Sequence, residues 1–221
     1  MIISIKHRFI FVAIPKTATH AFRVALRPHL DARDWEQCGL FETKTFPVEA
    51  LAQIGHGHIT CQQVRPFLVP ESWEAFFRFC TVRNPYDRFV SYCYFMNREN
   101  GRMEKDPLGT MKHIIEDAED AKQVLFRPQS EFVTDEEGRL MVDYVGKFEA
   151  LQHHFNRICH RVRLPHIQLQ RVNVSDSAPR RLCYDQELKE MVQTVYRQDF
   201  ALFDYPLALP DSAAEARPNR R

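Results

Sequence analysis

The feature of this sequence that most limits its fold is a continuous apolar run near the N-terminus, Phe9–Ile14. A short apolar run rich in β-formers, without polar residues at alternate positions, is typical of a strand covered on both faces of a parallel sheet. Pro15 ends the run, and an apolar helical pattern follows it. We expect that helix to be capped by Thr17 or Thr19 and to end at about Pro28. The chain therefore opens with strand, short polar loop and helix.

A second strong strand is predicted within Trp73–Val82, where Phe76–Val82 is again apolar and rich in β-formers. It ends at Arg83-Asn84-Pro85, and a helix is expected to follow. Five apolar residues of that helix recur at i, i+3, i+4, i+7 and i+8 and form one stripe: Tyr86, Phe89, Val90, Cys93 and Tyr94.

The remaining elements alternate in type. We expect helices over Phe46–Ile54, Asp106–Lys122, Glu149–Val162 and Tyr184–Phe200, strands over Met141–Phe148 and Ile167–Val174, and a turn at Asp135–Gly138. Strands that alternate with helices predict the α/β class, with a doubly wound, mostly parallel sheet of about four or five strands flanked by helices. We expect one domain over residues 1–209 and a disordered tail over residues 210–221.

Composition excludes several classes of protein. The 30 Lys and Arg against 29 Asp and Glu give a net charge of +1, so any anion site must be a local concentration of donors. We find no apolar stretch near the roughly 18 to 20 residues that span a bilayer, and no cleavage site follows Ile14. We therefore expect a cytoplasmic protein with reduced cysteines. The six cysteines contain no CxxC pair, which argues against structural zinc.

The loop after the first strand, Pro15–Ala21, has the residues of an anion cradle. In an open α/β sheet, ligands bind beyond the carboxyl ends of strands, where a helix N-terminus offers backbone N–H groups. Lys16 adds a cation, and Thr17 and Thr19 add hydroxyl donors. The loop has no glycine and is not a Walker A motif. The alternative is an ordinary turn with a surface lysine.

The junction after the second strand carries Arg83, with Ser91 about two turns into the next helix. A guanidinium can grip a phosphate bidentately, and a serine hydroxyl can add one bond. In the alternative, Arg83 pairs with an acid such as Asp87 and Ser91 only packs. Two such junctions at strand ends fit a ligand with two separated anionic groups.

Four stretches, in order, are similar to one family. IPKTATHAFR resembles the 5′-phosphosulfate loop of sulfotransferases that use 3′-phosphoadenosine 5′-phosphosulfate (PAPS), especially the carbohydrate group, and TVRNPYDRFVSYCYF resembles their 3′-phosphate motif. VDYVGKFEALQHHFNRIC and RVNVSDSAP, the latter followed by a helix ending in QDFALFDY, resemble further family stretches. The likeness spans about Phe9 to Tyr205. It implies a P-loop-like fold and PAPS as the sulfuryl donor, with no metal.

The resemblance also implies residue roles. Lys16 would reach the 5′-phosphate and the bridging oxygen of the leaving group, while Arg83 and Ser91 would hold the 3′-phosphate. Arg180 and Arg181 would cap the phosphates, unless they form only a solvated basic turn near Arg171, Asn173 and Ser175. The loop around the phosphosulfate would comprise Pro15, Lys16, Thr17, Ala18, Thr19, His20 and Ala21.

His56-Gly57-His58 resembles the histidine pair of the uronosyl 2-O-sulfotransferases. We expect His58 to be the general base and His56 its helper or an acceptor contact. A free imidazole has a pKa of about 6.5, so activity should rise through a pKa near 6 to 7. The alternative is a loop with histidines of no role. A zinc site is less favoured because no Cys or carboxylate has a matching spacing.

The expected function is in-line transfer of a sulfuryl group from PAPS to a hydroxyl of a carbohydrate or glycan, with no nucleic-acid partner and no integral membrane segment. Animal members of the group are longer and Golgi-anchored. This sequence shows no such anchor and is shorter, so we expect a soluble enzyme. Two alternatives stay open. One is a nucleotide kinase-like P-loop enzyme that binds ATP with magnesium. The other is a non-catalytic nucleotide- or glycan-binding module.

Overall fold

The computed structural model describes residues 1–39, 42–170 and 184–209. The chain forms two compact units. Unit 1 comprises Met1–Arg83 and Arg127–Val174, and unit 2 comprises Asn84–Phe126 and Ser175–Arg221. The residues outside the described ranges include the predicted tail over 210–221.

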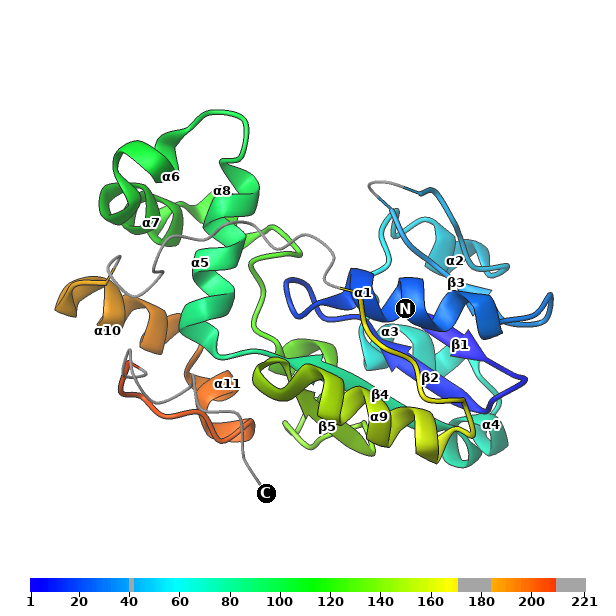
Figure 1. Ribbon diagram of the computed structural model, residues 1–221. Helices are drawn as coiled ribbons and strands as arrows, with labels where there is room; N and C mark the ends of the chain where they lie inside the picture. Colours follow the sequence, from blue (N-terminus) through cyan, green and yellow to red (C-terminus); the bar gives the residue numbers. More distant parts are fainter. Residues whose placement is uncertain (40–41, 171–183, 210–221) are drawn as a thin grey trace, which may run out of the picture. The chain divides into compact units, whose positions relative to one another are not determined.

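Unit 1 is built on one five-stranded sheet with the order β3-β1-β2-β4-β5 (Figure 1). Strands β2, β4 and β5 run parallel, whereas β1 is antiparallel to both β2 and β3. The strands are β1 (Ile2–Ser4), β2 (Phe9–Val12), β3 (Trp35–Glu36), β4 (Phe77–Val82) and β5 (Tyr144–Lys147).

The α/β class and the number of strands are confirmed, but the sheet is mixed rather than mostly parallel. The tight turn between β1 and β2, in which Arg8 has a φ of 52°, folds the first strand back beside the second. Such a turn can join only antiparallel strands. The predicted strand over Ile167–Val174 is also wrong as far as it is described, because residues 167–170 are irregular.

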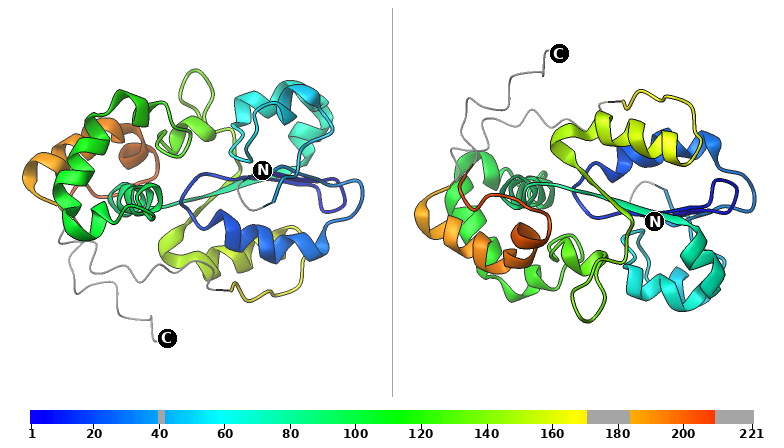
Figure 2. Two further views of the ribbon diagram at one scale, coloured as in Figure 1. Left: turned by 90° about the horizontal axis from the view of Figure 1, so that it is seen from above. Right: turned by 90° about the horizontal axis from the view of Figure 1, so that it is seen from below.

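Helices cover both faces of this sheet (Figure 2). Helices α1 (Thr19–Leu26) and α9 (Leu151–Arg161) pack on one face, where aromatic rings form the core. The Phe11 ring stacks on Phe22 and on Phe79, each at 5.3 Å between centroids, and Phe22 meets Phe155 edge-on at 4.6 Å. The opposite face carries α2 (Glu49–Ala52), α3 (Cys61–Val64) and α4 (Pro70–Ala75).

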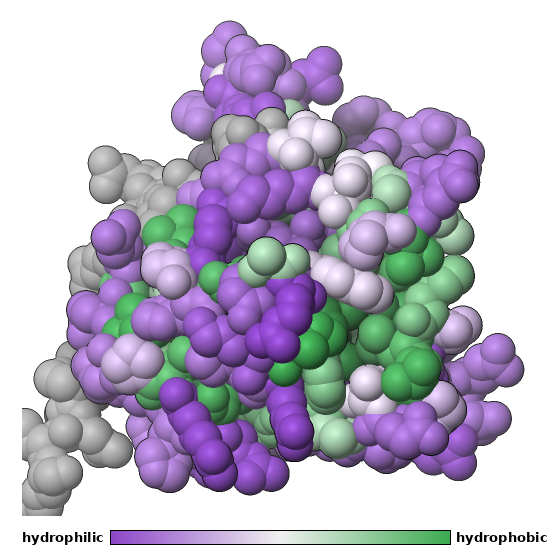
Figure 3. Space-filling model, turned by 90° about the vertical axis from the view of Figure 1, so that its right-hand side faces the viewer, coloured by the Kyte–Doolittle hydropathy of each residue, from purple (hydrophilic) through white to green (hydrophobic). Residues whose placement is uncertain are grey.

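Between α3 and α4 the chain exposes two large apolar side chains, Phe67 at 43% and Val69 at 60% of their surface. Figure 3 looks onto this end of unit 1 and shows hydrophobic residues gathered on one side of it among hydrophilic ones. Short 3₁₀ turns complete the unit: η1 (Arg27–His29), η2 (Arg65–Phe67), η3 (Ser130–Phe132) and η4 (Phe148–Ala150).

Unit 2 is helical. Its helices are α5 (Pro85–Met96), α6 (Arg102–Lys105), α7 (Pro107–Glu116), α8 (Ala118–Ala121), α10 (Gln186–Val195) and α11 (Arg197–Leu202). Helix α5 buries the predicted apolar stripe, except that Tyr94 is only partly covered. The predicted helix over Asp106–Lys122 breaks at Asp117, because this residue is extended and its carboxylate caps α8 instead. The predicted helix over Tyr184–Phe200 is likewise two helices, which meet at Tyr196.

The five described cysteines are all buried and form no disulfide with one another. Burial raises the pKa of Cys61 to about 12 and that of Cys159 to about 11. Within the ranges that the structure describes, no helix is long and apolar enough to cross a membrane.

Candidate active site

The loop that follows β2 bends sharply into α1. Lys16 and Ala18 both have a φ of 66°, in the left-handed region that favours glycine. Ala18 is the N-cap residue, and no side chain caps the helix there. The prediction that Thr17 or Thr19 caps this helix is therefore wrong. Thr19 is instead the first helical residue, and Thr17 turns into the protein.

Thr17 joins the loop to the end of β4. Its hydroxyl donates to the carbonyl of Ile14 at 2.9 Å and lies 3.0 Å from the hydroxyl of Thr81, which donates to the carbonyl of Thr17 at 2.9 Å. The side chain is fully buried. Its hydroxyl is committed to holding the loop, which corrects the expectation that it serves as a ligand donor. Thr17 can contribute to an anion site only through its backbone.

The start of α1 presents the polar groups that an anion requires. The first amides of a helix have no intrahelical acceptor, and the helix dipole places positive charge there. Lys16, Ala18 and Thr19 are half-buried around this turn, and His20 is exposed. Pro15 and Ala21 are buried and pack beneath it. All the predicted residues from 15 to 21 therefore lie on one loop and the first turn of α1.

His58 lies against the same strand end. Its Nδ1 is 2.7 Å from the carbonyl oxygen of Ala13, the residue directly after β2. A carbonyl can only accept, so Nδ1 carries the proton and Nε2 keeps its lone pair. His56 takes the opposite arrangement, because its Nδ1 accepts from the backbone N–H of His58 at 3.3 Å. A neutral His56 therefore offers Nε2–H as a donor, and His58 offers Nε2 as a base.

Burial sets the charge of both imidazoles. It lowers the pKa of His58 to about 3, and the nearby Arg23 guanidinium acts in the same direction. Burial also lowers the pKa of His56. His58 is therefore neutral throughout the physiological pH range, with the lone pair of its Nε2 unprotonated. The expected rise of activity through a pKa near 6 to 7 does not apply to this imidazole in the ligand-free protein.

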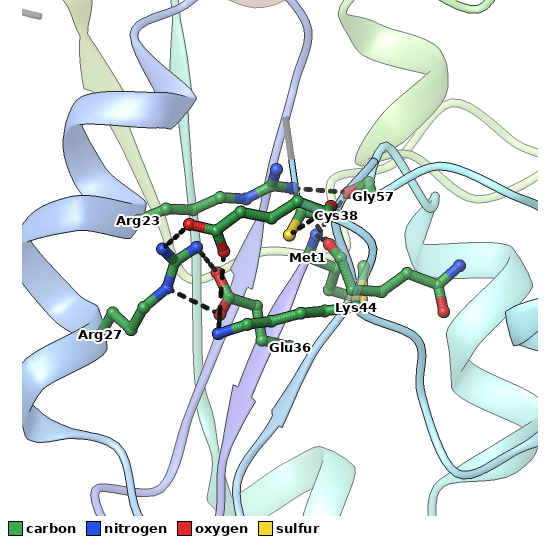
Figure 4. A network of polar contacts seen from close by, with 9 residues as sticks. Met1, Arg23, Arg27, Glu36, Cys38, Lys44 and Gly57 are labelled. Atoms are coloured by element: carbon green, nitrogen blue, oxygen red, sulfur yellow. Dashed lines mark hydrogen bonds and ion pairs between the residues drawn. The ribbon is translucent and has the colours of Figure 1, made fainter. Parts of the chain in front are cut away.

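Two nitrogen donors hold the peptide between the histidines. The carbonyl of Gly57 accepts from Arg23 Nη2 at 3.1 Å and from the amino group of Met1, and both donors also reach the carbonyl of Gln37 (Figure 4). Arg23 is buried, and within the described residues its Nε has no hydrogen-bond partner. Glu36 forms ion pairs with two further cations beside this cluster. Hydrogen bonds from Arg23 of α1 and from Met1, the residue before β1, thus anchor the histidine loop.

Arg83 leaves the sheet at the end of β4, the parallel neighbour of β2. Its backbone N–H donates to Gln129 Oε1 at 2.8 Å, and Gln129 Nε2 donates back to its carbonyl at 2.9 Å. The guanidinium lies 4.1 Å from the centre of the Phe148 ring, and the residue is 5% exposed. The carboxyl ends of adjacent parallel strands meet at one sheet edge, so Arg83 and Lys16 leave the sheet on the same side.

The other predicted donor contacts are placed differently. Ser91 is half-buried on α5 of unit 2. Arg180 and Arg181 lie outside the described residues, as do Arg171, Asn173 and Ser175. In the described ranges, no group of three or more His, Cys, Asp and Glu side chains is arranged to hold a metal ion.

A family model with the description "Sulfotransferase family" matches residues 1–206. The chain belongs to the sulfotransferase family. No curated protein and no solved structure matches it. The family supports sulfuryl transfer as the chemistry, rather than the phosphoryl transfer of the kinase alternative.

Sequence reasoning missed several residues that shape this sulfotransferase's site. Ala13 contributes only a backbone carbonyl, which no sequence pattern can mark. Gln129 and Phe148 lie far along the chain from the arginine that they position. Thr81 had a usable signal, because a hydroxyl at the end of a buried strand, beside a polar loop, requires a partner.

Gly57 offers a first test of the anchored loop. A Cβ at this position would overlap the Gln37 carbonyl and the Arg23 guanidinium, and it would lie 2.9 Å from Cys38 Cα. We expect Gly57→Ala to destabilise the sulfotransferase by about 1–3 kcal/mol in urea unfolding. Gly55→Ala is the comparison for backbone strain without overlap, because its φ of 72° disfavours alanine but its added carbon meets nothing closer than Gln53 O at 4.0 Å. Equal stability of the Gly57 variant and the wild type would contradict the anchoring.

Proposed function

We propose that this sulfotransferase moves a sulfuryl group from PAPS to a hydroxyl of a carbohydrate acceptor, with His58 as the general base. The observation that carries the proposal is the bond from His58 Nδ1 to the Ala13 carbonyl. It brings a neutral imidazole, with its lone pair on Nε2, to the strand end from which the Lys16 loop departs. A base and an anion cradle beside one another are what hydroxyl sulfation requires.

The residues present fit PAPS as the donor. The left-handed turns at Lys16 and Ala18 and the start of α1 suit a doubly charged phosphosulfate. Lys16 would lie near the 5′-phosphate, and Arg83 would bind the 3′-phosphate. PAPS supplies the sulfuryl group when bound. The described residues offer no metal cluster, and the proposed reaction uses none.

Each group of the candidate site has one role in the proposed transfer. His58 Nε2 accepts the proton of the acceptor hydroxyl as that oxygen bonds to sulfur and the bond from sulfur to the bridging oxygen breaks. Lys16 and the first amides of α1 stabilise the negative charge that develops on the departing phosphate. The His56 Nε2–H is a donor for an acceptor oxygen. Because burial keeps His58 neutral, no prior deprotonation of the enzyme is needed.

Donor identity is tested by thermal shift with 3′-phosphoadenosine 5′-phosphate (PAP), ADP and ATP with magnesium. We expect PAP alone to stabilise the protein strongly, by about 2.7 kcal/mol at 100 times its Kd. Arg83→Gln should weaken PAP binding about tenfold or more, because one charge-assisted bond is worth roughly 1.5–3 kcal/mol. Arg78→Gln, at the opposite end of β4, should leave the PAP affinity unchanged.

Two outcomes would count against the proposed function. A preference for ATP with magnesium would support the kinase alternative. Selective PAP binding, but no transfer of label from sulfur-labelled PAPS to any of a panel of neutral and acidic oligosaccharides, would support the binding-module alternative.

A further inference from the structure

A groove of about 570 Å³ lies along α9 and the amino ends of β4 and β5. Its volume is in the range of ligand sites. Phe77 and Tyr144 come from the two strands, and the helix supplies Asn156 and the cationic side chains. Roughly 20 Å along β4 separates Phe77 from Arg83, at about 3.3 Å per residue. The groove is therefore at the opposite end of the sheet from the donor loop.

The lining of this groove is strongly basic. Its cationic or ionisable side chains are His153, Arg157, His160 and Arg161, and none of its eight lining residues carries a carboxylate. These positions recur at helical spacing and share one face of α9. All four are exposed. Helix α9 contains no acidic residue, and within the described ranges neither arginine forms an ion pair. The carboxylate of Asp143 interacts electrostatically with Arg161, but its ion pair is with Arg78, at 2.7 Å.

Aromatic rings hold the two guanidinium groups in place. Arg157 lies over the ring of Tyr144 at 5.4 Å, and Arg161 lies over the ring of Phe77 at 5.6 Å. The Tyr144 hydroxyl is in turn 2.7 Å from His154 Nδ1. Cation–π contacts of this kind orient an arginine without neutralising it. The groove thus presents two positioned guanidinium groups that form no ion pair with the described residues, whereas a solvated helix face usually has interspersed charges of both signs.

We propose that this groove binds an anionic glycan, one whose sugars carry sulfate or carboxylate groups. A guanidinium fork matches the planar oxygens of either group bidentately. Asn156 and the two imidazoles are hydrogen-bonding partners for sugar hydroxyls. A single-stranded nucleic acid would need open aromatic faces for base stacking, and here the guanidiniums cover them. The identification of this glycan as the distal part of the acceptor chain rests on the proposed function.

The test is direct binding of a heparin octasaccharide to the full chain, followed by fluorescence anisotropy, with and without saturating PAP. We expect Arg157→Gln/Arg161→Gln to weaken this binding at least tenfold and to leave the PAP thermal shift unchanged. The control is Arg33→Gln/Arg139→Gln, which removes the same charge from two exposed, acid-paired arginines elsewhere in unit 1. This control should bind the octasaccharide within twofold of the wild type.

The outcomes separate this site from the donor site. Unchanged octasaccharide affinity in the α9 double variant would overturn the proposal, as would an equal loss in the control pair. Tighter binding of a single-stranded oligonucleotide of matched charge would also overturn it. If the wild type did not bind PAP at all, the proposed function would be refuted, but the octasaccharide result would still stand. With an active acceptor chain, the double variant should raise KM for long chains and leave kcat unchanged.

Discussion

His58→Ala is expected to lower kcat by about 10²–10⁴-fold, the usual range for removal of a general base. The Nδ1 bond to Ala13 fixes the ring, and burial keeps it neutral, so the variant loses a positioned lone pair at this strand end. PAP affinity should stay within a few-fold of the wild type, because the imidazole acts on the acceptor. His166→Ala, at an exposed position, is the matched control and should retain full activity.

The pH dependence of kcat/KM is a second test of the role of His58. For the ligand-free enzyme, kcat/KM for PAPS should be flat from about pH 5 upward with respect to His58. It should fall only as the pH approaches the pKa of about 3, where the imidazole gains a proton and loses its basic lone pair. An inflection between pH 6 and 7 that disappears in His58→Ala would show that the ring is charged more easily than its burial implies.

Lys16→Met is expected to lower kcat by about 10²–10³-fold, as does loss of one preorganised group that stabilises charge in a transition state. The charge on the leaving phosphate grows during the reaction, so the loss should be much smaller in PAP affinity than in kcat. Methionine keeps a similar length and meets the same left-handed φ of 66° as lysine does, so the comparison isolates the ammonium.

Two further variants define the role of Lys16. Lys16→Arg keeps the charge and should recover part of the rate. Lys105→Met, which removes an exposed lysine on α6, should have no effect. If Lys16→Met weakened PAP binding as much as it slowed turnover, the residue would serve ground-state binding rather than the reaction.

The elements whose residues form a long, continuous apolar pattern could be predicted from the sequence. Phe9–Val12 and Phe77–Val82 are strands because both lie in the middle of the sheet, where nearly every residue is apolar. Strands β1 and β3 are too short for periodicity to reveal them, and their position depends on pairing with β2 and with each other. The break at Asp117 reflects local competition, since an aspartate can cap a new helix as well as continue an old one.

The site shows the same division. The Lys16 loop and the histidine pair could be proposed as site residues from the sequence because their chemistry is carried by side chains. The inward turn of the Thr17 hydroxyl and the partner of His58 could not, because each depends on a group far away in the sequence. The low pKa of His58 also arises from burial, which belongs to the folded protein rather than to the histidine itself.

The two left-handed residues of the Lys16 loop have a thermodynamic consequence. A glycine-rich phosphate loop samples many conformations when empty, and its ligand must select one of them. Here the chain adopts the bend with Lys16 and Ala18 and secures it through Thr17 and Thr81. The loop therefore loses its conformational entropy during folding, and little ordering is left for the binding step. Ala18→Gly would relieve the backbone strain but would transfer part of that entropy loss to donor binding.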